Sequence, residues 1–162
     1  MSTALVIILM GSKSDLEHCQ KIAETCQKFG IETMMRIASA HKTAARLLDI
    51  LAAYEADPRP KVYITVAGRS NALSGMADAS VGAPVIACPP SSSSFGGADL
   101  YSSLRMPSGV APLVILEPEN AALAAAKIFG LAHPEILAKV KGYQEEHRQR
   151  LYAADKGLNQ SQ

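Results

Sequence analysis

The sequence has almost no net charge and no long hydrophobic run, and each absence excludes a class of protein. Its 16 basic and 15 acidic residues nearly cancel, so no overall field would attract nucleic acid or an anionic membrane. The first apolar run, ALVIILM at 4–10, is too short to span a bilayer and has no basic region before it. We therefore expect a buried strand, no leader and a cytoplasmic protein.

The sequence also lacks the common short motifs that indicate a particular type of reaction. It has no Walker pattern, no GxGxxG, no nucleophile elbow and no cluster of metal ligands. The cysteines Cys19, Cys26 and Cys88 are odd in number and follow no metal-ligand spacing. We expect them to be buried or half-buried thiols of a reducing compartment. Three of the four histidines, 18, 133 and 147, fall in or beside helical stretches and are expected to be solvated.

What is present is the alternation of strands and helices typical of one α/β domain. The chain has 162 residues, of which 48% are hydrophobic and 19% charged, enough for one sizeable core. Strands are predicted at 5–10, 31–37, 61–66, 84–88 and 113–116, and helices at 14–29, 43–56, 71–80, 119–131 and 134–154. The pattern predicts a three-layer αβα sandwich with a doubly wound parallel sheet over 1–162, ending in a short polar tail. The Ser- and Gly-rich stretch 89–103 is predicted to be a loop over the sheet's working edge.

Small polar residues follow the first predicted strand. Gly11 permits a tight turn, and Ser12 and Ser14 can offer hydroxyls beside free helical N–H groups, which suits a phosphate. The alternative is purely structural. Ser14 would then cap the helix, and Asp15 would only complement its dipole.

A histidine and a lysine lie side by side after the second predicted strand, in IASAHKTAARL at 37–47. Ser39 and the Lys42 ammonium could join the same anion site. His41 would lie beside it, and histidine is the side chain that most readily transfers protons near neutral pH. In the alternative, Ser39 or Thr43 caps the next helix, while His41 and Lys42 are simply exposed.

The third segment, AGRSNALSGM at 67–76, follows a buried strand. Its two glycines, Ser70 and Asn71 suggest a backbone-lined pocket for a flat ring. The alternative is a turn and a helix start with Asn71 near the cap, and Arg69 could be a surface charge, an anion partner or part of a salt bridge. Because the carboxyl ends of parallel strands share one edge, the three segments should converge. The residues thus predict a site for a phosphorylated small molecule beside a histidine, but no reaction.

Four motifs in this order resemble the aminoimidazole ribonucleotide (AIR) carboxylase family of purine biosynthesis. They are GSKSD at 11–15, SAHKT at 39–43, AGRSNALSG at 67–75 and LYSSLRMPSGVAP at 100–112, and the resemblance covers about residues 5–130. It implies a flavodoxin-like sandwich. In this family the mutases typically show SAHRTP and AGGAAHLPGM, whereas the carbon dioxide-dependent carboxylases, called class II, show SAHKT and AGRSNALSG. Lys42 and Ala72 match the second class.

The resemblance implies that the enzyme adds carbon dioxide to carbon 4 of 5-aminoimidazole ribonucleotide, without metal, biotin or ATP. The alternative within the family is N5-carboxyaminoimidazole ribonucleotide mutase. A more distant alternative is a non-catalytic nucleotide- or flavin-binding module, which would leave SAHKT and the later motifs unexplained. Family members are homo-oligomers, usually octamers or smaller assemblies such as tetramers, in which RMPSG contributes near a neighbour's active site.

The resemblance also assigns roles to residues. His41 would transfer the proton, Ser12, Ser14 and Ser39 would hold the phosphate with Lys42, and Asp15 would accept hydrogen bonds from the ribose. Ala67, Gly68, Ser70 and Leu73 would place backbone around the ring and the carbon dioxide. Ala40, Arg69 and Asn71 complete the predicted substrate-binding set.

Overall fold

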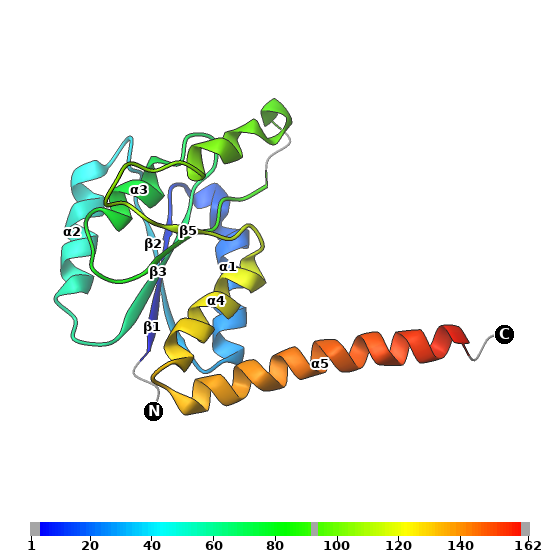
Figure 1. The fold of residues 1–162 in the computed structure, drawn as a ribbon. Coiled ribbons are helices and arrows are strands. Elements are labelled where there is room, and N and C mark those ends of the chain that lie inside the picture. Colours follow the sequence, from blue (N-terminus) through cyan, green and yellow to red (C-terminus); the bar gives the residue numbers. More distant parts are fainter. Residues whose placement is uncertain (1–3, 92–93, 160–162) are drawn as a thin grey trace.

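A five-stranded parallel sheet lies between two layers of helices in the computed structural model, which describes residues 4–91 and 94–159 (Figure 1). The strands are β1 (Leu5–Met10), β2 (Glu32–Ile37), β3 (Lys61–Val66), β4 (Val85–Ala87) and β5 (Leu113–Val114), in the spatial order β2-β1-β3-β4-β5. The α-helices are α1 (Leu16–Lys28), α2 (Ala44–Glu55), α3 (Ala72–Asp78), α4 (Pro118–Gly130) and α5 (Pro134–Asn159). Two 3-10 helices are η1 (Lys13–Asp15) and η2 (Ser94–Ser103). The predicted doubly wound, flavodoxin-like sheet is confirmed.

The central strand β1 shows why the sheet has two hydrophobic faces. All six of its residues are buried, as expected of a parallel strand covered on both sides. Val6, Ile8 and Met10 point into a core that includes residues of α1, α4 and the start of α5. The alternate residues, including Ile7 and Leu9, point into a second core shared with α2 and α3. The three-layer prediction is therefore confirmed by the packing of one strand.

Three predicted elements differ from the structure. The predicted strand 113–116 contains only the two-residue strand β5. The predicted loop 89–103 is in large part the 3-10 helix η2, and positions 92–93 lie outside the described residues. The last predicted helix, 134–154, ends too early, because α5 continues to Asn159, and positions 160–162 lie outside the described residues. Polar residues such as Gln and Lys support a helix as well as apolar ones do, so polarity did not mark its end.

Helix α5 has an inner half that packs and an outer half that extends away from the body (Figure 1). In the inner half, Ile136 and Val140 are buried, and the Tyr143 ring contacts Phe29 edge-to-face with 5.3 Å between centroids. In the outer half, Leu151 and Tyr152 are 71% and 64% exposed. Among the described residues, no helix combines the length and hydrophobicity that a membrane span requires.

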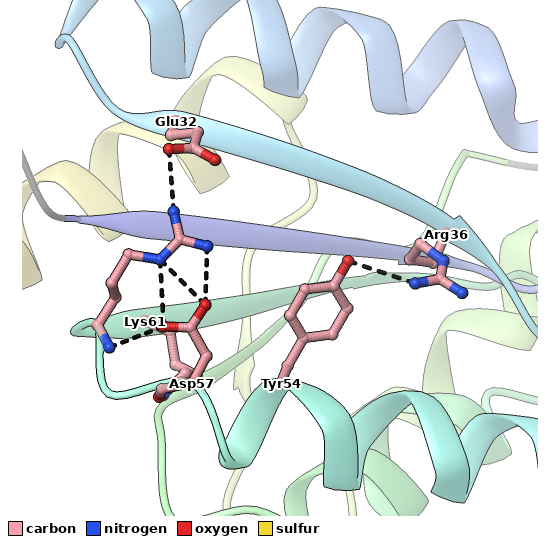
Figure 2. A network of polar contacts seen from close by, with 6 residues as sticks. Glu32, Arg36, Tyr54, Asp57 and Lys61 are labelled. Carbon is pink, nitrogen blue, oxygen red and sulfur yellow. Dashed lines mark hydrogen bonds and ion pairs between the residues drawn. The ribbon is translucent and has the colours of Figure 1, made fainter.

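A polar network ties the amino edge of the sheet together (Figure 2). Arg59 donates to Glu32 at the start of β2 (Nη1–Oε2 3.0 Å) and to both carboxylate oxygens of Asp57. Lys61 at the start of β3 donates to the Asp57 carbonyl oxygen (2.8 Å). Farther along β2, toward its carboxyl end, Arg36 donates to the Tyr54 hydroxyl (3.4 Å). These contacts are solvent-accessible, so they add more to the alignment of β2 and β3 than to stability.

Truncating a core residue of β1 should destabilise the protein strongly. Ile8 is fully buried, so Ile8→Ala should lower the free energy of unfolding by about 2–5 kcal/mol through lost burial and a residual cavity. Urea denaturation at fixed protein concentration measures this loss. The control is Glu24→Ala on the exposed side of α1, which should stay within about 0.5 kcal/mol. Equal stabilities for the two variants would contradict the assignment of β1 to the core.

Candidate functional site

The candidate site lies where neighbouring strands send the chain to opposite faces of the sheet. Strand β1 leads into α1 on one face, whereas its neighbour β3 leads into α3 on the other. The loops after β1 and β3 therefore diverge and leave a crevice at their carboxyl ends, the usual place for a ligand in such sheets. A cavity of about 550 Å³ occupies this position. It is lined by Gly11, Ser12, Ser14, Asp15, Ser39, Ala40, His41, Lys42, Ala67, Gly68, Arg69, Ser70 and Leu73.

The turn after β1 is stabilised by its own serines. Ser12 caps η1, with its hydroxyl oxygen accepting from the Ser14 amide (3.3 Å) and lying 3.0 Å from the Ser14 hydroxyl. The alternative that Ser14 caps the helix is wrong, since Asp15 is the N-cap residue of α1 and makes no side-chain capping bond there. Both serine side chains remain exposed at the cavity.

The turn after β2 is closed by hydrogen bonds among residues 39–43. The Thr43 amide donates to the Ser39 carbonyl (2.8 Å), the Ser39 amide to the Thr43 hydroxyl (2.9 Å) and the Lys42 amide to the Ser39 hydroxyl (3.2 Å). Thr43 is the N-cap residue of α2, so the structural reading of this segment is partly right. These bonds use backbone and hydroxyl groups and leave the side chains of His41 and Lys42 exposed at the cavity.

The turn after β3 supplies a wall of backbone and small side chains, with Asn71 buried behind it. Asn71 caps α3 by accepting from Ser74 (amide 3.2 Å, hydroxyl 2.8 Å), and its Nδ2 donates to the Ser103 hydroxyl (2.8 Å). The predicted helix cap is thus confirmed. Asn71 does not line the cavity, so the structure does not bring this member of the predicted binding set to the others.

Asp15 is the half-buried acid of the site. Burial raises the pKa of its carboxyl above the ordinary value, and the nearby His18 and the hydrogen bonds of Ser12 and Ser14 offset only part of that rise. A carboxylate held in this way has lost water without gaining a cation, so it is able to accept hydrogen bonds from a ligand.

His18 lines a cavity beside the candidate site, although the sequence predicted that it would be solvated. It is half-buried rather than solvated, with Nε2 3.3 Å from the Cys88 sulfur, and it lines a neighbouring cavity of about 400 Å³ that shares Ala67 and Gly68 with the first. Burial lowers the pKa of His18 and raises that of the Cys88 thiol to about 12, so the pair is neutral near pH 7. The sequence feature that could have indicated this is the position of His18 one helical turn after Asp15, which places both residues on one face.

The other two histidines predicted to be solvated differ from each other. His133 is half-buried beside Glu135, whereas His147 is exposed.

The chemical groups at the cavity favour an anion over a cation. The Lys42 ammonium and the serine hydroxyls can donate to an anion, and His41 can exchange a proton. No three His, Cys, Asp or Glu side chains within residues 4–91 and 94–159 lie in an arrangement that could hold a metal ion.

Comparison with known proteins identifies the family. A family model described as AIR carboxylase matches residues 5–150. The chain belongs to the AIR carboxylase family. The phosphoribosylaminoimidazole carboxylase of Treponema denticola is 58% identical over 154 residues, 95% of this chain and 97% of that protein. The enzyme of the same name from Archaeoglobus fulgidus is 56% identical, over 94% of this chain and 83% of its own.

Solved structures of the AIR carboxylase family share the fold in detail. The crystal structure of Treponema denticola PurE superimposes with a TM-score of 0.94 at 57% identity, covering 96% of this chain and 98% of the other. The chain is thus an enzyme of a purine-biosynthesis family, acting on a small-molecule substrate, and not the non-catalytic binding module kept as a distant alternative.

Neutralising Asp15 should stabilise this AIR carboxylase family member when no substrate is bound. Because burial raises the Asp15 pKa in the folded state, the ionised carboxylate costs stability above that pKa. The free energy of unfolding of Asp15→Asn should therefore exceed that of the wild type at pH 7 to 8. The difference should shrink as the pH falls through the raised pKa of the folded state. It should vanish below the unfolded-state pKa of about 4, where the carboxyl is protonated in both states.

Urea denaturation between about pH 3 and pH 8 measures this difference and its loss at low pH. The control is Asp49→Asn, at an exposed position of α2, which should unfold like the wild type. A variant at Asp15 that is less stable throughout this range would show that the ionised carboxylate stabilises the empty site.

Proposed function

We propose that this enzyme adds carbon dioxide to carbon 4 of 5-aminoimidazole ribonucleotide, giving 4-carboxyaminoimidazole ribonucleotide in purine biosynthesis. The observation that carries the proposal is the cavity between the loops that follow β1 and β3. Its volume is about 550 Å³, and its lining combines groups that can donate hydrogen bonds to an anion, a histidine and a wall of backbone. This volume lies within the range of about 300–1,000 Å³ usual for small-molecule sites. The activity named for the relatives from Treponema denticola and Archaeoglobus fulgidus supports it.

The substrate phosphate would bind at the end of the cavity formed by the first two turns. Ser12, Ser14 and Ser39 would donate hydroxyl hydrogen bonds, and Lys42 would supply the charge. Asp15, beside them, would accept hydrogen bonds from the ribose hydroxyls. Its raised pKa supports this role, because hydrogen bonds from the ribose would replace the water that burial removed.

The aminoimidazole ring would lie against the wall formed after β3. Gly68 has no side chain, Ala67 is buried and Leu73 is almost fully buried, so a flat ring could approach the backbone closely. Ser70 and Ala40 would complete the surroundings of the ring. Carbon dioxide is weakly bound and uncharged, so the pocket acts mainly by positioning it and excluding water.

His41 would transfer the proton of the reaction. The ring is electron-rich, so its carbon 4 attacks carbon dioxide and forms a carbon–carbon bond. The intermediate carries both hydrogen and carboxylate on that carbon. When His41 removes the hydrogen as a proton, the electron pair of the C–H bond returns to the ring and restores aromaticity. This route is chemically complete without metal, biotin or ATP, and we propose that the enzyme uses none.

The choice of carboxylase over mutase rests on residues of the second and third turns. Lys42 stands where the mutases of the family have arginine, and Ala72 stands where they have a second histidine. Both positions are at or beside the cavity, since Lys42 lines it and Ala72 begins α3 directly after the wall. Lysine holds a phosphate as a point charge, whereas arginine uses a planar fork, so the nucleotide should sit differently in the two classes.

We further propose that the enzyme is a cytoplasmic homo-oligomer, an octamer or a tetramer. The three cysteines are free and buried, which is compatible with a reducing compartment. The outer half of α5 supports the proposal of a homo-oligomer. Along this part of the helix, which extends away from the body of the chain, Leu151, Tyr152 and Leu158 are 71%, 64% and 75% exposed. Such residues pack against a second chain more favourably than they face water.

Two reactions in parallel test the proposed function. One contains 5-aminoimidazole ribonucleotide with dissolved carbon dioxide, and the other contains N5-carboxyaminoimidazole ribonucleotide, with product formation followed by absorbance. We expect 4-carboxyaminoimidazole ribonucleotide from the first mixture only, because Lys42 and Ala72 belong to the carboxylase pattern. Product from the second mixture only would make the enzyme a mutase.

Removing the proton-transfer group should abolish turnover while leaving binding intact. His41→Asn keeps a polar side chain at the cavity and should lower kcat by about 100-fold or more, with nucleotide Kd unchanged by calorimetry. The matched variant at the neighbouring position, Lys42→Arg, should instead alter nucleotide Kd, because the fork replaces the point charge. Wild-type turnover in His41→Asn would contradict the proton-transfer role of His41. Unchanged Kd and turnover in Lys42→Arg would contradict the phosphate-binding role of Lys42.

A further inference from the structure

One residue in the wall of the cavity has an unusual backbone conformation. Arg69 has φ of 60°, and within residues 4–91 and 94–159 it is the one residue other than glycine with a positive φ. This left-handed region is sterically unfavourable for a residue with a Cβ. Other parts of the structure must therefore hold Arg69 there.

The backbone on both sides of Arg69 is held by the end of η2. The Arg69 amide donates to Oδ2 of Asp99 (3.1 Å), and the Asn71 amide donates to the Ser102 hydroxyl oxygen (3.0 Å). That hydroxyl also lies 3.2 Å from the Arg69 carbonyl oxygen and 2.8 Å from the Asp99 carbonyl oxygen. The short segment 99–102 thus acts as a template for the turn that carries Arg69.

Asp99 makes these contacts from outside the substrate cavity. It lines the neighbouring cavity of about 400 Å³, which shares Gly68 with the substrate cavity, and is absent from the lining of the substrate cavity. A Cβ at Gly68 would lie 3.9 Å from Oδ2 of Asp99, so the carboxylate closely backs the wall. The contact of Asp99 with the wall of the substrate cavity is therefore its hydrogen bond to the backbone amide of Arg69.

We propose that Asp99 is a positioning residue that holds Arg69 in the left-handed conformation and so aims the peptide groups of Gly68 to Ser70 at the substrate ring. If Arg69 relaxed to a negative φ, the peptide groups beside it would rotate, and their N–H and C=O groups would leave the wall. The inference rests on the proposed function for its substrate, but its geometric part concerns the free enzyme.

The test compares substitutions at Asp99 in two backgrounds. Asp99→Ala should lower kcat/KM by about 10- to 100-fold, as expected when a binding wall is misplaced by a fraction of an ångström or more. Asp99→Asn keeps an oxygen acceptor and should stay within a few-fold of wild type. In the Arg69→Gly background, Asp99→Ala should cost less than about 3-fold, because glycine adopts a positive φ without help.

The control separates positioning from general stability. Asp57 also accepts a hydrogen bond from a backbone amide, that of Arg59 (2.9 Å), but at the opposite edge of the sheet. Asp57→Ala removes an equivalent backbone contact and should leave kcat/KM unchanged. Equal effects of Asp99→Ala on kcat/KM in the two backgrounds, or wild-type kinetics in Asp99→Ala, would overturn the inference.

Amide hydrogen exchange gives a readout that needs no substrate. The Arg69 amide should be protected in the wild type and in Asp99→Asn, and should exchange faster in Asp99→Ala. If the wild type turned over neither substrate, the proposed function would fail and this readout would still decide the inference. Unchanged exchange at Arg69 in Asp99→Ala would overturn it whatever the activity.

Discussion

The site depends on one topological constraint, which is that adjacent strands β1 and β3 send the chain to opposite faces of the sheet. Two loops that leave in opposite directions cannot fill the space between them, so a crevice forms at the carboxyl edge. The turn after β2 closes one side of this crevice, because β2 pairs with β1 in full register. Serines, a lysine and a histidine that are far apart in the chain therefore share one cavity.

The wall of the cavity is stiffened from behind by buried hydrogen bonds. Thr65 on β3 lies 2.7 Å from the Ser74 hydroxyl, and Asn71 links Ser74 to Ser103. Among the described residues, no buried side-chain nitrogen or oxygen is left without a partner. A fully satisfied polar network in a low-dielectric interior is rigid and directional. It fastens β3, α3 and η2 together at the place where the substrate ring would lie.

The same site carries features that cost stability. Arg69 is held at an unfavourable φ, and the half-buried Asp15 carboxyl has a raised pKa. Backbone strain of this kind costs on the order of 1–3 kcal/mol and persists only where the surroundings impose it. At Arg69 these surroundings are the Asp99 carboxylate and the Ser102 hydroxyl. The burial of the two hydrophobic cores, one on each face of the sheet, offsets the cost in stability.

The sequence by itself determined the strand–helix order, the parallel sheet and the three turns of the site. Strong apolar runs such as 5–10 and 61–66 predicted their strands to the residue, because a strand buried on both faces needs continuous hydrophobicity. The four motifs predicted the family, which the match over residues 5–150 confirms. These features are local, so a local pattern is sufficient to reveal them.

The tertiary structure alone decided which polar residues face the cavity and which are buried behind it. In the structure Asn71 is buried in the hydrogen-bond network behind the cavity, and His18 lies beside Cys88 rather than in solvent. Helix α5 continues to Asn159, beyond its predicted end. It also placed Asp99, thirty positions along the chain, against the Arg69 amide. Burial and hydrogen-bond partners depend on contacts between distant segments, and no property of a single segment specifies those contacts.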